Sequence, residues 1–393
     1  MKTAIVILNW NTREYLEKFL PGLLHSIRNV EDAEVVVADN ASSDGSLEYV
    51  KENLPEVKVI AFDKNHGYTG GYNKAIARIM DEDSPEYIVL MNSDVEVQDG
   101  WLEPLVRKME STPDCGACAP KIHSWTDRDK FEYAGAAGGH IDGFGYPFCR
   151  GRILDIVESD YGQYDHITQK IFWGTGACLM VRSPLFMKLG GFDDRFFAHM
   201  EEIDLCWRMQ LEGYKIYAVP ESTVYHVGGG TLPNNSPYKL YLNYRNNLLM
   251  LSNNYPRTVA LEYIQNGKEL YWAAKRGIKA GFNVIMARMF FDDLAAVLYL
   301  LTFRTKSFMA VVKAHRDYRR LKRRTSKMEV AEYLQGHMDV TINGMYRKSI
   351  IVQRILDGSA VVVDLRQGGA PEVELLDGKH LAGKGDGAQI LGL

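Results

Sequence analysis

The sequence lacks an excess of positive charge. Its 46 lysine and arginine residues are outnumbered by 50 aspartate and glutamate residues, which gives a formal net charge of −4. Proteins whose main role is to bind nucleic acid usually carry a basic excess that attracts the phosphate backbone. Nucleic-acid binding is therefore disfavoured, and we expect no nucleic-acid partner.

Cysteine is scarce and irregularly placed. The chain has five cysteines, an odd number, and they are scattered along the sequence. This usage argues against a disulfide framework and favours a reducing, cytoplasmic compartment. Cys115 and Cys118 form a single CxxC near His123 without the second half that a zinc site needs, so we assign them to packing.

Long uncharged apolar runs are also missing. The N-terminus, MKTAIVILNWNTREY, has a short apolar run without the cleavage site of a signal peptide, and it predicts a buried strand. A later apolar stretch, VIMARMFFDDLAAVLYLLTF, carries Arg288, Asp292 and Asp293. A membrane-spanning helix needs about 20 mostly apolar residues without such charges, so we expect none.

What the sequence does have is an alternation of short apolar segments and helical stretches from residue 1 to about 110. The apolar segments are AIVILNW, EVVVADN, VKVIAF and YIVLMNSD. Continuous apolar strands of this kind predict a parallel sheet with helices on both faces, and ligands bind such sheets at the carboxyl ends of the strands. With 393 residues, the chain is long enough for one large α/β domain and a smaller appendage.

Polar side chains follow three of these strands at the ligand-binding edge. They are Asn9 and Asn11 after the first strand, Asp39 and Asn40 after the second, and residues 92–94 after the last. Strands often end in polar turns, so any one of these groups alone says little. Three groups at one edge predict a ligand site.

The rest of the chain is less regular. Residues from about 115 to 170 are rich in glycine and aromatic residues, which predicts an irregular or hairpin insertion beside a cleft. We expect a helix from about Glu201 to Gly213 and then a strand over YKIYAVP. Helices are expected over about 257–330, strand character over about 338–366, and a frayed C-terminus.

Two side chains are candidates to hold a divalent cation. Asp94 follows the apolar strand YIVLM at the ligand-binding edge, and His226 follows a later strand and precedes three glycines. Carboxylate and imidazole groups are common metal ligands, and a bound cation can neutralise a departing diphosphate. The alternatives are an ordinary acidic turn at Asp94 and a merely polar loop histidine at His226.

An acidic pair opens a later helix. Glu201 and Glu202 begin the segment EEIDLCWRMQLEG, which continues through Asp204. A carboxylate beside a reacting hydroxyl can act as a general base. The alternative is structural, because the helix dipole favours acidic residues in the first turn.

Asp39 and the segment NHGYTGGYN are candidates for nucleotide binding. The Asp39 carboxylate could accept a hydrogen bond from the imide N–H of a pyrimidine base, or it could cap a turn with Ser42 and Ser43. The glycines of NHGYTGGYN allow a ligand to approach the backbone closely at the start of a helix. This segment lacks the GxGxxG spacing of dinucleotide-binding folds, so an NAD enzyme is disfavoured.

Taken in order, these motifs resemble those of family 2 glycosyltransferases of the GT-A fold, particularly the branch of rhamnosyltransferase- and galactofuranosyltransferase-like proteins. VILNWN is similar to the family's first strand, ADNASSDGS to its nucleoside-binding segment, NHGYTGGYN to its N-x-G-x-x-x-G-x-N segment, and NSDVE to its metal-binding motif. The stretch from GGFDDRFF to YHVGGGT is similar to the family's long signature. The resemblance covers roughly residues 3–250. It implies a Rossmann-like α/β domain with a mostly parallel sheet and a C-terminal helical extension.

The resemblance also implies roles for individual residues. It assigns the nucleobase to Asp39, the cation and donor to Asp94, and the cation or diphosphate to His226. We further expect nucleotide contacts from Asn9, Asn11, Asn65, Gly71, Asn73 and Ser93, acceptor contacts from Trp173 and Asp204, and phosphate or acceptor contacts from Tyr244 and Arg245. A buried aromatic is the alternative for Trp173. Glu202 would be the base, with Glu201 as its rival. Two positions depart from the family pattern: Asn92 replaces the first Asp of the DxD motif, and Glu202 stands where the family commonly has Asp.

The implied activity is inverting glycosyl transfer. A hydroxyl of a cell-surface glycan or lipid-linked glycan would attack the anomeric carbon of a UDP- or dTDP-type sugar, with Mg²⁺ or Mn²⁺ at the diphosphate. A nucleotidyltransferase is disfavoured because VILNWNTREY has no Gly-rich loop. A non-catalytic nucleotide-sugar-binding scaffold of a polysaccharide assembly complex is the other alternative, and the joint presence of Asp94, Glu202 and His226 argues against it.

The expected organisation has three parts. They are a catalytic domain at 1–250, with the nucleotide bound by about 1–110 and the acceptor by about 111–250, a helical region at 251–330, and a small β-containing segment with a flexible tail at 331–393. Basic residues concentrate between Lys313 and Lys327 after an apolar helix, which suits a peripheral position on the anionic inner face of the cytoplasmic membrane. A solvated helical face that packs on the catalytic domain is the alternative.

Overall fold

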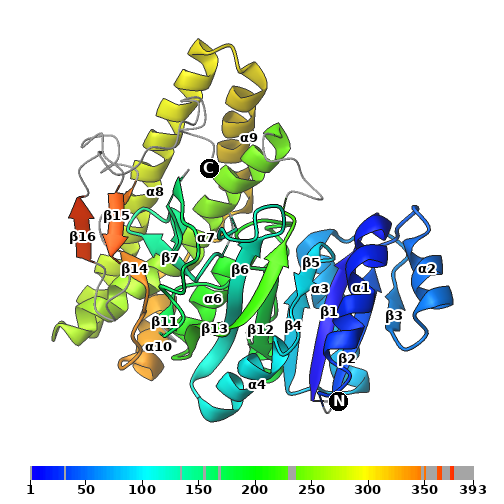
Figure 1. Cartoon of the computed structure of the whole chain (residues 1–393). Helices are drawn as coiled ribbons and strands as arrows, with labels where there is room; N and C mark the ends of the chain where they lie inside the picture. Colours follow the sequence, from blue (N-terminus) through cyan, green and yellow to red (C-terminus); the bar gives the residue numbers. More distant parts are fainter. Residues whose placement is uncertain are drawn as a thin grey trace.

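The computed structural model places an α/β unit beside a long helical extension (Figure 1). It describes residues 2–30, 32–132, 135–153, 156–166, 170–228, 236–346, 349–350, 361–364 and 372–375. The expected flexible tail at 376–393 lies outside these ranges, as do residues 351–360 of the expected strand segment.

Strands from the N-terminal region form the parallel half of the central sheet. They are β1 (Thr3–Asn9), β2 (Ala33–Asp39), β3 (Lys58–Ala61) and β4 (Tyr87–Met91), in the spatial order β4-β1-β2-β3. The helices that alternate with them are α1 (Arg13–Ser26), α2 (Ser46–Asn53) and α3 (Gly67–Glu82). This βα alternation is the one predicted from the apolar segments, and it confirms the α/β class.

The other half of the central sheet is mixed. Its strands are β5 (Val95–Val97), β6 (Cys115–Ser124), β11 (Lys170–Ile171), β12 (Cys178–Arg182) and β13 (Lys215–His226). β12 runs antiparallel to both β4 and β6, and β13 runs parallel to β6. The antiparallel pairing of β5 with β13 sets Val95 opposite His226, so the end of β13 meets the residues that follow β4.

Both faces of the central sheet are buried. In β1, Ile5 and Ile7 belong to a core shared with α1 and α4 (Leu102–Ser111). Ala4 and Val6 belong to the core on the opposite face, shared with α3, α5 (Ser183–Lys188) and α6 (Glu201–Leu211). The strands read as continuous apolar runs because neither face meets water.

The insertion rich in glycine and aromatic residues forms a small second sheet, as its expected hairpin character predicts. β7 (Gly139–Asp142), β8 (Pro147–Cys149), β9 (Arg152–Ile153) and β10 (Ile156–Val157) pair antiparallel in chain order. A strand from the C-terminal part, β14 (Met345–Tyr346), completes the sheet by pairing parallel with β7. No local sequence pattern predicts this long-range pairing of β14 with β7.

The helical extension contains α7 (Pro237–Gln265), α8 (Leu270–Leu301), α9 (Thr305–Leu321) and α10 (Lys327–His337). α7 begins well before the expected helical start near residue 257, because the Ser236 side chain caps it by accepting a hydrogen bond from the backbone N–H of Lys239. The helix runs unbroken through residue 250, where we expected one region to end. Farther along, β15 (Val361–Asp364) pairs with β16 (Glu372–Leu375).

Two of the three charged residues that interrupt the apolar stretch of α8, Arg288 and Asp292, are buried, while Asp293 is exposed. Arg288 donates from Nε to Asp292 Oδ1 at 2.9 Å and from Nη1 to Asn247 Oδ1 on α7 at 2.9 Å. Asp292 Oδ2 lies 3.3 Å from Nε2 of His315 on α9. These groups therefore connect α8 with its two neighbouring helices. Within the described ranges, no helix has the length and apolar character needed to cross a bilayer.

Candidate active site

A hydrogen-bonded network joins the ends of β1 and β2. Asn9 donates from Nδ2 to Asp39 Oδ1 at 2.7 Å and to Ser46 Oγ at 2.7 Å, while Thr12 Oγ1 donates to Asn9 Oδ1 at 2.6 Å. Asp39 Oδ2 accepts from the backbone N–H of Ser42 at 3.0 Å. The alternative predicted for Asp39, that it caps a turn, is therefore observed for one of its oxygens, Oδ2. An ionised carboxylate has about four lone-pair sites, so this residue can still accept from a base.

The adjacent loops are tied to this edge by asparagine side chains. Asn11, which adopts a left-handed backbone conformation, accepts from the N–H of Ser43 at 2.7 Å. Asn40 donates from Nδ2 to Asn65 Oδ1 at 3.0 Å, and Asn65 Oδ1 also accepts from the N–H of Gly67 at 2.7 Å. The start of α3 is thereby held against the ends of β1 and β2.

Two residues of α3 that we expected to bind nucleotide make close contacts within the protein. A Cβ on Gly71 would lie 2.7 Å from Leu8 Cδ1, so a larger residue there would require the Leu8 side chain to move. Asn73 donates to the Phe192 carbonyl at 2.8 Å and to Asp194 at 2.8 Å, and it accepts from the N–H of Phe192 at 2.9 Å. These contacts occupy both side-chain groups of Asn73, so it connects α3 with the segment before α6.

Asp94 and His226 meet at the predicted cation site. His226 Nε2 lies 3.2 Å from Asp94 Oδ1, and its Nδ1 lies 3.7 Å from Glu132 Oε2. Burial lowers the pKa of His226, but the hydrogen bonds and charges of the two carboxylates outweigh it and raise the pKa to about 10. In this state the imidazole is protonated, and it balances the two buried carboxylates.

The donor set at this site fits a cation that also binds phosphate. Among the described residues, no group of three or more His, Cys, Asp or Glu side chains is arranged to hold a metal. Mg²⁺ in phosphate sites typically takes one or two protein ligands and fills its other positions with phosphate oxygens and water. Asp94 with a deprotonated His226 supplies such a pair, and Asn92 Nδ2 lies 3.5 Å from His226 Nε2 beside it.

Glu201 and Glu202 form the first turn of α6. Burial raises the pKa of Glu202 to about 7, and burial together with the charge of Glu202 raises the pKa of Glu201 well above its ordinary value. Within the described residues, Oε2 of each carboxyl has no hydrogen-bond partner. Glu201 is only 4% exposed, whereas Glu202 is partly exposed as a residue although its Oε2 is buried, so Glu202 lies nearer the surface.

The loop before this acidic pair has an unusual backbone. Phe197, His199 and Met200 all have φ near +70°, a left-handed conformation that residues other than glycine rarely adopt. The φ values are 66°, 69° and 71°. Each such residue costs on the order of 1–3 kcal/mol, so neighbouring groups must hold the loop in place.

Asn246 and Arg245 on α7 supply that support. Asn246 Nδ2 lies within hydrogen-bonding distance of the carbonyls of Phe196, Ala198 and His199, at 3.0, 2.7 and 2.7 Å. Arg245 Nη2 donates to the Phe196 carbonyl at 2.7 Å. From the other side, the backbone N–H groups of Tyr68 and Thr69 donate to the Phe197 carbonyl at 3.0 and 3.2 Å. Arg245, which we expected to bind acceptor, therefore positions the loop.

The other expected acceptor residues lie in the interior. Asp204 is fully buried and accepts from Arg208 Nε at 2.7 Å and from Asn254 Nδ2 at 2.8 Å. Trp173 is buried and donates to the His140 carbonyl at 2.8 Å, while its ring covers Gly139. Tyr244 is buried in the cluster of α7, α8 and α9. These three side chains thus make contacts within the protein, and Trp173 has the buried position that was its alternative.

The cation site and the acidic pair flank the same short segment. The backbone N–H of Asn92 donates to the Ala177 carbonyl at 3.0 Å, and the Tyr68 hydroxyl donates to the Gly176 carbonyl at 3.1 Å. A Cβ on Gly176 would lie 2.8 Å from the Tyr68 oxygen and 4.0 Å from Glu202 Cβ. The segment that follows β4 and leads to Asp94 is therefore bonded to Ala177 through Asn92, and Glu202 lies beside Gly176 from α6.

Asp39 lies at the same edge of the sheet, because β1 separates β2 from β4. Neighbouring strands are about 4.8 Å apart, so the end of β2 is roughly 10 Å from the end of β4. Ser93, the remaining predicted nucleotide residue, follows β4 directly before Asp94. The predicted positions 39, 94, 202 and 226 are therefore grouped along one edge.

Sequence reasoning missed three residues of this site. Tyr68 contacts the segment beside Glu202, Glu132 faces His226, and Asn246 holds the loop before α6. Tyr68 lies inside the NHGYTGGYN segment, which offered a signal. Glu132 lies in the irregular insertion and Asn246 in a helix without a motif, so no local pattern identified them.

Comparison with known proteins agrees with this arrangement. Residues 4–174 match the model of the family described as "Glycosyl transferase family 2". A relative from Mycobacterium tuberculosis, "N-acetylglucosaminyl-diphospho-decaprenol L-rhamnosyltransferase", is 28% identical over 236 residues, which cover 56% of this chain and 75% of the relative. "Rhamnosyltransferase WbbL" of Escherichia coli K12 is 24% identical over 240 residues, covering 56% of this chain and 82% of that protein.

Two solved structures that match part of this chain contain a bound nucleotide or nucleotide sugar. "GalNAc-T7 with UDP, GalNAc and Mn2+" is 16% identical with a TM-score of 0.49 and covers 64% of this chain and 47% of its own. "Mannosyltransferase PcManGT from Pyrobaculum calidifontis in complex with GDP-Man and Mn2+" is 14% identical with a TM-score of 0.48. The match covers 81% of this chain and 86% of that protein.

The α/β sheet, the C-terminal helices and the family match agree with the GT-A fold class expected from the sequence. The family match covers β1 to β4, where the nucleotide motifs lie, and the rhamnosyltransferase relatives extend the similarity over more than half of the chain. The chain thus contains a glycosyl transferase family 2 domain and is a glycosyltransferase.

Proposed function

We propose that the protein transfers a sugar, with inversion, from a nucleoside-diphosphate donor to a hydroxyl of a cell-surface or lipid-linked glycan. The observation that carries this proposal is that Glu202 lies beside Gly176, while the next residue, Ala177, is hydrogen-bonded to Asn92 just before the Asp94–His226 pair. A base and a site for the departing diphosphate must flank the reacting carbon in such a transfer.

The donor is a UDP- or dTDP-type sugar in this proposal. Asp39, supported by Asn9, accepts from the pyrimidine base at the end of β2. Asn11, Asn65 and Ser93 line the same edge. Asp94 and His226 hold Mg²⁺ or Mn²⁺ at the diphosphate, and a bound cation there stabilises the negative charge of the leaving group.

Glu202 is the general base in this proposal. Its carboxylate takes the proton of the acceptor hydroxyl while the oxygen forms a bond to the anomeric carbon and the bond to the diphosphate breaks. A base works best with a pKa near the operating pH, and burial raises the pKa of Glu202 to about 7. Glu201 remains the rival, but its deeper burial favours its neutral form.

The acceptor is a lipid-linked glycan at the inner face of the cytoplasmic membrane. The Mycobacterium relative's name specifies a sugar linked to diphospho-decaprenol, which supports this class of acceptor. The helices that follow the catalytic region also expose large apolar side chains; on α8 they include Phe282, Met286, Phe290, Leu294 and Leu301. Basic residues of the 313–327 segment lie near an anionic bilayer surface in this arrangement.

A donor screen tests the proposed reaction. Purified protein is incubated with UDP- and dTDP-sugars, with and without Mn²⁺ or Mg²⁺, and release of nucleoside diphosphate is measured. We expect turnover of one donor class that depends on the cation. Binding of a nucleotide sugar without any release or transfer, across donors and with a lipid-linked acceptor present, would instead identify the non-catalytic scaffold.

A further inference from the structure

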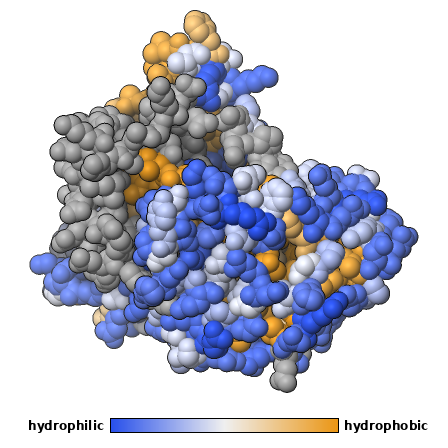
Figure 2. Space-filling model, in the orientation of Figure 1, coloured by the Kyte–Doolittle hydropathy of each residue, from blue (hydrophilic) through white to orange (hydrophobic). Residues whose placement is uncertain are grey.

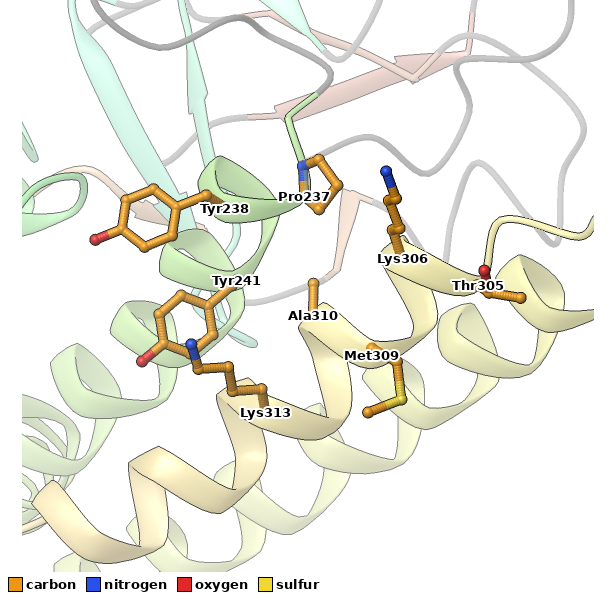
Figure 3. A pocket seen from close by; sticks show the side chains of 8 residues that line it. All are labelled: Pro237, Tyr238, Tyr241, Thr305, Lys306, Met309, Ala310 and Lys313. Atoms are coloured by element: carbon orange, nitrogen blue, oxygen red, sulfur yellow. The ribbon is translucent and has the colours of Figure 1, made fainter.

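An open cleft separates the start of α7 from the start of α9 (Figure 3). Its volume is about 420 Å³. The residues that line it are Pro237, Tyr238, Tyr241, Thr305, Lys306, Met309, Ala310 and Lys313. None of these residues belongs to the donor site described above, and the cleft combines aromatic and aliphatic walls with two cations.

The two lysines give the cleft a positive charge. Lys306 and Lys313 are exposed and lie two turns apart on α9, roughly 10 Å along its axis. Lys313 Nζ lies 4.7 Å from the centre of the Tyr241 ring, which holds its ammonium beside the cleft. Asp317 also approaches Tyr241, but Arg316 and the Tyr241 hydroxyl bind its carboxylate at 3.0 Å each. An anion is therefore favoured between the two ammonium groups.

An apolar surface adjoins this charged cleft. Leu301 at the end of α8 and Phe303 in the turn before α9 are 71% and 90% exposed, and Met309 within the cleft is 56% exposed. Figure 2 shows apolar side chains gathered where these two helices protrude from the molecule. A soluble anion would leave these side chains in water. A molecule that joins a phosphate to a hydrocarbon chain satisfies both the lysines and the apolar surface.

The cleft is also connected to the base. The Tyr241 hydroxyl accepts from Arg245 Nη1 at 2.9 Å, and Arg245 Nη2 binds the Phe196 carbonyl in the loop that leads to Glu202. In the first turn of α7, the Lys239 side chain is close to His199 of that loop, where its charge adds to burial in lowering the pKa of His199 to about 4. The N-terminal part of α7 therefore lines the cleft and also borders the loop that carries the acidic pair.

We infer that this cleft binds the phosphate-bearing head of the lipid-linked acceptor, with Lys306 and Lys313 at the phosphate and the lipid chain along Leu301, Phe303 and Met309. The inference rests on the proposed function, since it identifies where that acceptor is held. A glycan attached to a head in this position extends past the first turn of α7 toward Glu202.

Binding of a short isoprenyl phosphate tests this inference. Farnesyl phosphate is titrated into the full chain below its micelle concentration, and farnesol and inorganic diphosphate are titrated in parallel. The variant Lys306→Glu/Lys313→Glu is compared with Lys51→Glu/Lys74→Glu, which makes the same charge change at exposed lysines of α2 and α3. All four lysines are exposed, so we expect each variant to retain the wild-type melting temperature, which is measured as a control.

We expect farnesyl phosphate to bind the wild type and the control variant equally, and to bind the Lys306→Glu/Lys313→Glu variant at least tenfold more weakly. Farnesol and diphosphate should each bind the wild type at least tenfold more weakly than farnesyl phosphate. Equal farnesyl phosphate affinity in the three proteins would overturn the inference. Tighter binding of diphosphate alone would assign the lysines to a soluble anion and would also overturn it.

These outcomes are independent of the proposed reaction, because the titration needs no donor and no turnover. If the protein turns over a donor and the lysine variant binds farnesyl phosphate as tightly as the wild type, the proposed glycosyl transfer is supported. In that case only the assignment of the cleft to the acceptor is contradicted. If farnesyl phosphate binding depends on the two lysines but no donor is turned over, the assignment of the cleft is supported and the proposed glycosyl transfer is contradicted.

Discussion

The ends of β1 and β2 and the first turn of α6 both bury polar side chains, but they satisfy them differently. At the strand ends, Asn9 and Asp39 are hydrogen-bonded to each other and to neighbouring side chains. At α6, the carboxyls of Glu201 and Glu202 are buried with Oε2 atoms that lack a partner among the described residues. The loop before them is also strained.

This difference separates a region built for binding from one built for chemistry. A fully hydrogen-bonded network keeps its geometry when a ligand arrives, which limits the entropy lost on binding. Buried carboxyl oxygens without partners cost stability, but the raised pKa values of these groups make them effective bases. We therefore expect changes at α6 to act mainly on turnover, and changes at the strand ends to act mainly on donor affinity and stability.

Of the substitutions that test this comparison, replacing Glu202 should lower turnover the most. Glu202→Gln keeps the size of the side chain but removes its basicity, so we expect turnover to fall by roughly a thousandfold. The KM for the donor should change little, because the donor edge is untouched. Glu201→Gln is the matched control and should reduce turnover by less than about tenfold. The reverse ranking of the two variants would make Glu201 the base.

Removing the support of the strained loop should have the next largest effect. Asn246→Ala deletes the amide that lies beside three loop carbonyls, so the acidic pair loses its fixed position and kcat should fall by roughly tenfold to a hundredfold. The donor KM should remain within about twofold. Asn266→Ala, at the exposed C-terminal end of the same helix, serves as the control. An unchanged kcat in Asn246→Ala would show that the loop holds its conformation by other contacts.

The pH profile distinguishes the two regions further. Because burial raises the pKa of Glu202 to about 7, the base is protonated at lower pH, and kcat should fall by about tenfold per unit below pH 7. The folded pKa exceeds the unfolded value, so this group stabilises the fold below pH 4.5 and loses that contribution as the pH rises through 7. Kinetics and urea unfolding from pH 5 to 8 measure both trends. A kcat independent of pH over this range would exclude a base with this pKa.

The smallest effect on turnover is expected at the strand ends. Asn9→Ala leaves Asp39 and Thr12 without a shared partner, so stability should fall by roughly 1–3 kcal/mol. The donor KM should rise several-fold while kcat stays within about threefold. Asn53→Ala, at an exposed asparagine of α2, is the control for the loss of an amide. A kcat loss as large as that of Asn246→Ala would contradict the division of roles.

The elements near the N-terminus were predictable because local patterns specify them. Continuous apolar strands alternating with helices imply a parallel sheet, and its carboxyl edge gathers Asn9, Asp39 and Asp94 whatever the details of packing. The acidic pair was also found at the start of a helix, as its sequence indicates. The position of each of these residues follows from the strand or helix to which it belongs.

The acceptor residues were not predictable in the same way. Trp173, Asp204 and Arg245 have side chains that suit ligand binding, but each is buried and bonded to residues distant in sequence. Whether a polar or aromatic side chain faces a ligand or the interior depends on which element packs against it. That information is absent from a local pattern, as the late pairing of β14 with β7 also illustrates.

The sequence by itself determined the fold class and which polar residues follow each strand. It could do so because hydrophobic periodicity and chain connectivity act over a few residues at a time. Tertiary structure alone decided that α7 supports the loop before Glu202, that Glu132 faces His226, and that α7 and α9 enclose a cleft. These contacts join positions far apart along the chain. They arise only when the packed sheet and helices bring such positions together, and the free energy of burial, rather than any local preference, selects them.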